Sequence, residues 1–223
     1  MSILVEAAVD SLDDALAAVA GRADRLELCA NLAVGGTSPD RELIAHVLER
    51  VDVPVLVMIR PRGGSFVYTT AELARMRREI ETAIELGAAG VVLGALDAER
   101  RIAEEQTRSL VSAAAGAPVT FHRAFDRTLD LLAALDTLVS LGVSRVLTSG
   151  GAATAIDGAE TLTALVERAG DDIEILAGGG VRANNVRELV RRTRVREVHA
   201  RCEGDSERIR AISDAVRAES SPR

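Results

Sequence analysis

The segment Thr120–Asp126 concentrates residues that could do chemistry, since it reads Thr-Phe-His-Arg-Ala-Phe-Asp. His122 could move a proton, Asp126 is a candidate catalytic carboxylate, and Arg123 could hold a carboxylate or phosphate. The residues at 119–121 alternate like a buried strand, so the charged side chains follow directly where that strand becomes a loop. In parallel α/β folds this edge of the sheet is where ligands bind.

Similar polar side chains stand in or directly after other expected strands: Glu6, Glu27, Cys29, Arg60, Arg62, Thr148, Ser149 and His199. Charges inside apolar strands cost several kcal/mol each unless they are paired. One interpretation is therefore a salt-bridge network that plugs the barrel. The other is a pocket in which Glu27 or His122 moves a proton. The residues expected to bind the substrate are then Glu6, Arg60, Arg62, Arg123, Thr148, Ser149 and His199.

A glycine run, Gly178–Gly180, follows the seventh expected strand. It is similar to the phosphate cradle that barrels form after strands seven and eight, although a plain tight turn has the same sequence. We expect a phosphate or carboxylate to lie between Arg60 or Arg62 and the backbone N–H groups of Gly179 and Gly180.

Short apolar runs alternate with amphipathic ones along the whole chain, which predicts eight strand and helix units. The strands are expected at residues 3–9, 24–29, 55–60, 90–95, 118–121, 145–148, 173–177 and 195–199. In the first half of the chain, helices are expected to begin at Ser11, Ser38 and Thr70. Gly21, Gly87 and Gly142 are expected to end helices in left-handed turns. No linker interrupts the pattern, so residues 1–223 are predicted to be one (β/α)₈ TIM barrel. An open dinucleotide-binding sheet is disfavoured because no GxGxxG follows the first strand.

Composition excludes several classes of protein. A net charge of −7 and a pI near 5.1 argue against nucleic-acid binding. No apolar stretch has the length of a membrane span, and no signal-peptide pattern opens the chain, so a cytoplasmic protein is expected. The two cysteines, Cys29 and Cys202, are too few for a disulfide framework.

The chain contains no lysine, because all 27 basic residues are arginine. Schiff-base chemistry on a lysine, and with it the anchoring of pyridoxal phosphate, is therefore excluded.

Six motifs together resemble the CutC copper-homeostasis family: residues 26–30 (LELCA), 59–64 (IRPRGG) with Phe66 and Tyr68, 120–126 (TFHRAFD), 147–150 (LTSG), 177–181 (AGGGV) and 197–199 (EVH). The resemblance implies a TIM barrel, a role with copper and a homodimer. Cys29, His122 and His199 are then candidate copper ligands. Members often carry a cysteine just after the strand-one glutamate, where this chain has Ala7 and Ala8, so we expect copper(I) to bind weakly.

Two functional hypotheses therefore stand beside each other. The chain is either a copper-handling protein, or an enzyme that uses lysine-independent acid and base chemistry on a small phosphate- or carboxylate-bearing metabolite.

Overall fold

The structure is a computed structural model that describes residues 3–217. Within that range, eight parallel strands close into a barrel, each pairing with the next and β8 pairing with β1. The strands are β1 (Leu4–Val9), β2 (Arg25–Leu28), β3 (Val55–Met58), β4 (Gly90–Leu93), β5 (Val119–Phe121), β6 (Arg145–Thr148), β7 (Glu174–Gly178) and β8 (Glu197–Arg201). The predicted (β/α)₈ barrel is confirmed.

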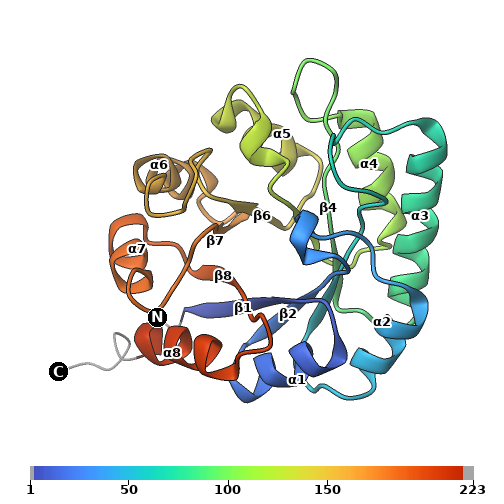
Figure 1. The fold of residues 1–223 in the computed structure, drawn as a ribbon. Helices are drawn as coiled ribbons and strands as arrows, with labels where there is room; N and C mark the ends of the chain where they lie inside the picture. Colours follow the sequence, from blue (N-terminus) through green and yellow to red (C-terminus); the bar gives the residue numbers. More distant parts are fainter. Residues whose placement is uncertain (1–2, 218–223) are drawn as a thin grey trace.

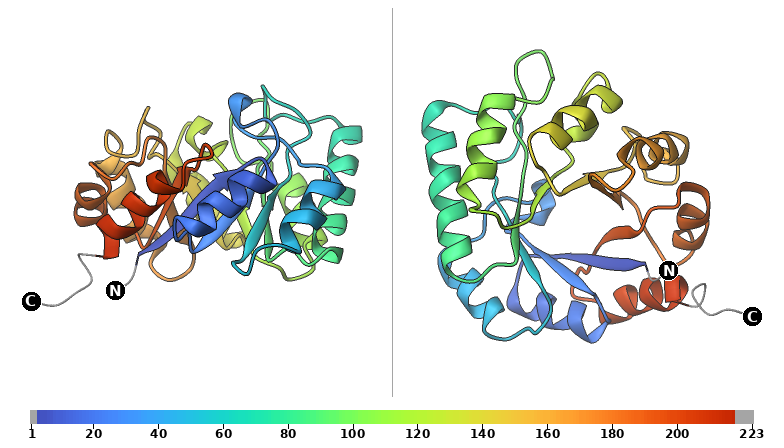
Figure 2. Two further views of the ribbon diagram at one scale, coloured as in Figure 1. Left: turned by 60° about the horizontal axis from the view of Figure 1, so that its bottom comes forward. Right: turned by 180° about the vertical axis from the view of Figure 1, so that it is seen from behind.

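A helix follows each strand, and the helices form a ring around the barrel (Figure 1). They are α1 (Leu12–Ala20), α2 (Arg41–Leu48), α3 (Thr70–Glu85), α4 (Glu104–Ala113), α5 (Leu131–Ser140), α6 (Ala159–Ala169), α7 (Val186–Thr193) and α8 (Ser206–Arg217). Short 3₁₀ turns, η1 (Leu32–Val34) and η2 (Phe125–Arg127), lie in the loops after β2 and β5. Figure 2 shows the same ring from the side and from behind. Within residues 3–217 no helix has the length and apolar content of a membrane span.

The apolar core lies mainly between the sheet and the helices. Leu26 and Leu28 of β2 are fully buried in it, because alternate strand residues point to opposite faces of a sheet. The residues between and beside them, Arg25 and Glu27, point the other way, into the barrel. The inside of this barrel is therefore partly polar, and the site is built there.

Two of the expected helix starts are displaced. The cap of α2 is Asp40, whose side chain accepts from the backbone N–H of Leu43, whereas Ser38 was expected. The cap of α3 is Thr69, one residue before the expected Thr70, and it forms a capping box with Glu72.

The expected left-handed glycines are confirmed at Gly87 (φ +98°) and Gly142 (φ +75°) but not at Gly21. Gly21 has φ −77°, and the left-handed residue is its neighbour Arg22. Gly21 is needed for space, because a Cβ there would lie 2.5 Å from the carbonyl oxygen of Ser206.

Candidate functional site

Glu6, Glu27 and His199 meet inside the barrel where β1, β2 and β8 lie side by side. In the strand register Glu6 is opposite His199, and Ala8 is opposite Glu27. Nδ1 of His199 is 2.8 Å from Oε1 of Glu6, and Nε2 of His199 is 3.7 Å from Oε2 of Glu27. One ligand atom from each of the three lies within 4.8 Å of the others. We call these three residues the carboxylate–imidazole cluster.

Burial affects the two carboxyl groups of this cluster differently. For Glu6, burial alone would raise the pKa, but hydrogen bonds and charge from His199 and Arg25 outweigh it and lower the pKa to about 2. For Glu27, burial and the charge of Glu6 raise the pKa, although His199 opposes them. Glu6 is thus an ionised acceptor, and Nδ1–H of His199 donates to it. That leaves Nε2 of His199 facing Glu27.

His199 itself is held toward its charged form. Burial alone would lower its pKa, but Glu27 and Glu6 raise the pKa above its ordinary value. Glu27 has one oxygen, Oε1, that is buried and has no hydrogen-bond partner within the described residues.

Cys29 lies beside the cluster without belonging to it. Its Sγ is 3.6 Å from Oε2 of Glu27, to which the thiol donates. Burial and the neighbouring charge of Glu27 raise the pKa of the Cys29 thiol well above its ordinary value. A Cβ on Gly36 would come within 3.1 Å of the sulfur, so the β2–α2 loop closes over it. The thiol is therefore protonated at neutral pH and is shielded from solvent.

An ion-pair network lies on the amino-terminal side of the cluster. Nε of Arg25 donates to Glu6 over 2.5 Å, and Nη2 of Arg25 donates to Glu197 over 2.5 Å. Arg145 donates to the same Glu197 and to Oγ1 of Thr120, over 2.6 and 3.2 Å. Arg25, Arg145 and Glu197 were not among the residues predicted from the sequence. The sequence pattern that could have found Arg25 is the alternation of side chains along a strand, because Arg25, Glu27 and Cys29 are two residues apart and share one face of β2 and its end.

Arg60 follows β3 and is the second buried arginine. Its Nη1 donates to the carbonyl oxygens of Val34 and Gly36 over 3.2 and 3.0 Å, and Nη2 donates to that of Gly64 over 3.2 Å. The guanidinium carbon is 4.9 Å from the centre of the Phe66 ring. Within residues 3–217 Arg60 forms no ion pair, and its buried Nε has no acceptor.

His122 is buried and also lies next to Phe66, with ring centres 5.0 Å apart. Its Nδ1 accepts from the backbone N–H of Ala124 over 3.2 Å. Burial, assisted by the charge of Arg60, lowers the pKa of His122 to about 3. His122 is therefore neutral with its proton on Nε2, and that nitrogen has no partner in the described part of the chain. The structure does not bring His122 into the carboxylate–imidazole cluster.

Asp126 stands at the centre of a different set of hydrogen bonds. Its carboxylate accepts from Oγ1 of Thr148 (2.5 Å), from the backbone of Ser149 (3.2 Å) and Gly151 (3.0 Å), and from Nε of Arg123 (2.8 Å). Nη2 of Arg123 donates to Oγ of Ser149 over 2.7 Å. These contacts join the loops after β5 and β6, and a catalytic role for Asp126 stays a prediction.

Arg62 and the glycine turn lie apart. Arg62 donates to Glu72 over 2.6 Å and to carbonyl oxygens of its own loop, so its side chain faces away from the barrel axis. Gly179 and Gly180 follow β7, which is across the closed barrel from β3. The arginine next to them is Arg123, whose Nη1 would be 3.3 Å from a Cβ on Gly179. The β3 arginines and this turn thus lie on opposite sides of the barrel, and an anion clamped between them stays a prediction.

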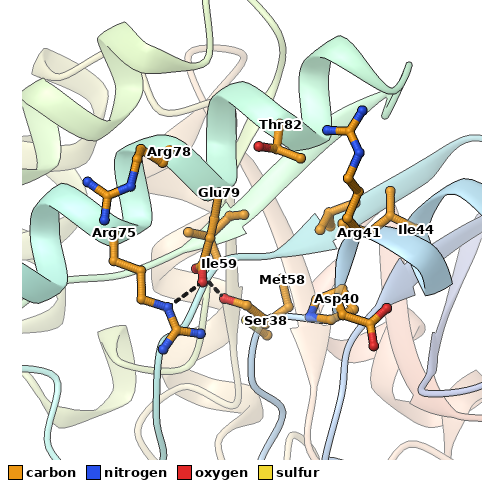
Figure 3. A pocket seen from close by; sticks show the side chains of 12 residues that line it. Ser38, Asp40, Arg41, Ile44, Met58, Ile59, Arg75, Arg78, Glu79 and Thr82 are labelled. Carbon is orange, nitrogen blue, oxygen red and sulfur yellow. Dashed lines mark hydrogen bonds and ion pairs between the residues drawn. The ribbon is translucent and has the colours of Figure 1, made fainter.

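A surface groove of about 370 Å³ lies outside the barrel, between α2 and α3 (Figure 3). Oγ of Ser38 donates to Glu79 over 2.6 Å, and Arg75 donates to the same carboxylate over 2.6 Å. Ser38 also accepts from the backbone N–H of Arg60 over 2.9 Å. The groove contains no part of the cluster, but its wall fixes the backbone that carries Arg60.

Fold and site together define a (β/α)₈ barrel with a buried carboxylate–imidazole cluster inside its sheet. Comparison with known proteins gives the family. The sequence model of the CutC family matches residues 3–204, so the chain belongs to the CutC family.

Relatives named CutC cover most of the chain. The protein from Xanthomonas campestris pv. campestris (strain B100) is 46% identical over 200 residues, which are 90% of this chain and 83% of that protein. The one from Caulobacter vibrioides (strain NA1000 / CB15N) is 47% identical over 197 residues, 88% of this chain and 80% of that protein. The chain is also similar to the crystal structure of CutC from Streptococcus agalactiae, a protein named for copper homeostasis, with 38% sequence identity and a TM-score of 0.84. The match covers 93% of this chain and 99% of that chain.

Proposed function

We propose that this chain takes part in copper homeostasis by holding one copper ion in the carboxylate–imidazole cluster of Glu6, Glu27 and His199. Copper is then the cargo of the protein and not a resident cofactor. The observation that carries the proposal is Oε1 of Glu27, a buried acceptor with no hydrogen-bond partner among residues 3–217, in a group of three side chains that can bind a metal. A bound cation would satisfy that oxygen and offset the burial of the carboxylate.

The spacing of the cluster supports this reading. Two ligands that each lie about 2.1 Å from an ion, as nitrogen and oxygen ligands of zinc do, are about 3.4 Å apart at a tetrahedral angle. Nε2 of His199 and Oε2 of Glu27 are 3.7 Å apart, so a small movement would place both on one ion. Glu6 holds Nδ1 of the imidazole, which is the usual arrangement for a histidine that binds a metal through its other nitrogen.

The donor types favour copper(II) over copper(I). Carboxylate and imidazole ligands suit divalent ions, and copper(II) binds most tightly among the first-row divalent metals. Copper(I) prefers thiolate and thioether ligands. The nearest thiol, Cys29, is protonated and is not part of the cluster.

A copper(II) titration against a competing chelator tests the proposal. Glu27→Gln keeps the shape of the side chain but removes an anionic ligand, and we expect it to weaken binding by about 10- to 100-fold. Glu79→Gln is the matched control, because Glu79 lies outside the barrel and should leave the affinity unchanged. Equal affinities in the wild type and Glu27→Gln would refute copper binding at this cluster. The homodimer and the cytoplasmic location remain predictions.

A further inference from the structure

Arg60 carries a buried positive charge that no carboxylate balances. Among residues 3–217, the buried arginines are Arg25, which is 5% exposed, and Arg60, which is 6% exposed. Arg25 is bound by Glu6 and Glu197. Within the described range, the side-chain hydrogen bonds of Arg60 go to carbonyl oxygens, and its Nε–H has no acceptor. A buried charge normally needs a counter-charge, so the arrangement is complete only with an anion.

His122 supplies a second donor of the same kind. It is 4% exposed, and the N–H of Ala124 occupies Nδ1, which fixes the proton on Nε2. That Nε2–H has no acceptor within the described residues. A neutral imidazole donates one hydrogen bond without adding charge, which suits an anion whose charge Arg60 already balances.

The ring of Phe66 contacts both groups, with the guanidinium carbon of Arg60 at 4.9 Å and the ring of His122 at 5.0 Å from its centre. The hydroxyl of Tyr68, in the same loop, is a further buried polar atom with no hydrogen-bond partner of standard geometry among the described residues, and the charge of Arg60 acts on it. The backbone of Arg60 is held by Ser38, which Glu79 and Arg75 fix from the groove side (Figure 3). The donors are thus mounted on a rigid backbone and covered by the exposed loop at residues 61–69.

We propose that Arg60 and His122 form a binding site for the carboxylate or phosphate group of a small molecule, with Nε–H of Arg60 and Nε2–H of His122 as its donors. The anion reaches them when Phe66 and its loop move aside. This site is separate from the copper cluster, because none of its residues is a member of that cluster. It gives the protein a second ligand class, a small organic acid or phosphate ester.

Thermal-shift and calorimetric titrations of the full chain with inorganic phosphate in one arm and with succinate in the other test the proposal. We expect at least one of the two anions to raise the melting temperature. Arg60→Met should abolish that shift, and His122→Phe, which keeps a ring of similar size, should weaken binding by about tenfold. Arg62→Met is the matched control, since this neighbouring arginine is engaged by Glu72 and its own loop and should retain the shift.

The arms of the test separate the ligand sources and the two proposals. A response to phosphate alone identifies a phosphate site, and a response to succinate alone identifies a carboxylate site. If Arg60→Met does not fold, His122→Phe decides the question. No response of the wild type to either anion, or an unchanged response in His122→Phe, would overturn the proposal. Glu27→Gln should bind the anion like the wild type, so a failure here is distinct from a failure of the copper site.

Discussion

The sides of the barrel that carry Arg25 and Arg60 balance their buried charge differently. Arg25 lies between Glu6 and Glu197, and Arg145 shares Glu197 from the other side. Arg60 lies among carbonyl oxygens beside Phe66 and the neutral His122. Both side chains are equally buried, so burial alone does not distinguish structure from function. The difference lies in the partners.

A closed set of ion pairs stabilises the fold without needing a ligand. An incomplete set keeps donors or acceptors available, as Nε of Arg60, Nε2 of His122 and Oε1 of Glu27 are. These atoms lie after β3, after β5 and on β2, all within the stretch of the barrel from β2 to β5. The comparison therefore separates residues that hold the barrel together from residues that are available to ligands.

The largest expected effect is the loss of Arg25. Arg25→Met leaves Glu6 and Glu197 without their shared cation, and breaking a buried ion pair in this way costs about 3–5 kcal/mol. Arg60→Met should lower the free energy of unfolding by less than about 1 kcal/mol or should raise it, because no buried carboxylate loses its partner. Urea unfolding at pH 7 without added anions measures both. Equal losses of unfolding free energy in Arg25→Met and Arg60→Met would contradict the proposed difference between the two arginines.

The two glutamates of the cluster should also differ. The pKa of Glu6 is lowered to about 2 from 4.5, so its ionised form is stabilised by about 3 kcal/mol, and Glu6→Gln should cost about that much at pH 7. The pKa of Glu27 is raised, and the neutral Glu27→Gln should cost less than about 1 kcal/mol. Urea unfolding of the metal-free protein measures the difference. A larger cost for Glu27→Gln would show that Glu27 belongs to the closed network.

The lowered pKa of His122 predicts that the free energy of unfolding depends on pH. Its folded pKa of about 3 is below the unfolded value of 6.5, so between these values the unfolded chain binds a proton that the folded protein does not. The contribution of His122 is therefore fully present above about pH 6.5 and is lost as pH falls toward 3. Between pH 7 and pH 5 the loss is about 2 kcal/mol.

His122→Phe removes this titration, so its unfolding free energy should fall less than that of the wild type over the same range. His46→Phe is the control, because it removes a histidine in the last turn of α2, outside the barrel, and keeps His122, so its unfolding free energy should still fall between pH 7 and pH 5. Parallel pH profiles for the wild type and His122→Phe would contradict the assignment of a buried neutral imidazole.

The fold could be predicted because its signals are local. Each unit contains an apolar strand and an amphipathic helix in about 25 residues, and the bounds of β6 match the expected ones. The cap of α2 was misassigned because Ser38 and Asp40 are both good caps. Asp40 is the cap because the hydroxyl of Ser38 instead donates to Glu79 and accepts from the backbone N–H of Arg60.

The partners within the site could not be predicted, because they depend on how the barrel closes. Arg25 and Glu197 are 172 residues apart and meet only because β8 pairs with β1. Arg60 and Arg62 have the spacing of one strand face, but β3 ends at Met58 and Arg62 turns outward to Glu72. Strand alternation therefore predicts the shared face of Glu27 and Cys29 correctly but does not apply to Arg60 and Arg62.

The smallest expected effect is that of Cys29→Ser. A serine hydroxyl can donate to Glu27 as the thiol does, and Cys29 is not one of the three clustered ligands. We expect the copper(II) affinity to change by less than about threefold and the free energy of unfolding by about 1 kcal/mol or less. Cys202→Ser is the control, because Cys202 is also a buried thiol but is not one of the clustered ligands, and its Sγ donates to the carbonyl oxygen of Asp205.

A titration with copper(I) is the decisive measurement for Cys29→Ser. The cluster supplies carboxylate and imidazole ligands, and the thiol of Cys29 beside it has a pKa raised by burial and by Glu27, so copper(I) should bind more weakly than copper(II). An anaerobic competition titration against a copper(I) chelator compares the two ions. Tight one-to-one copper(I) binding that is lost in Cys29→Ser but kept in Cys202→Ser would contradict this expectation. It would move the metal from the cluster toward Cys29, because a bound copper(I) ion would then have to displace the thiol proton and take the sulfur as its main ligand.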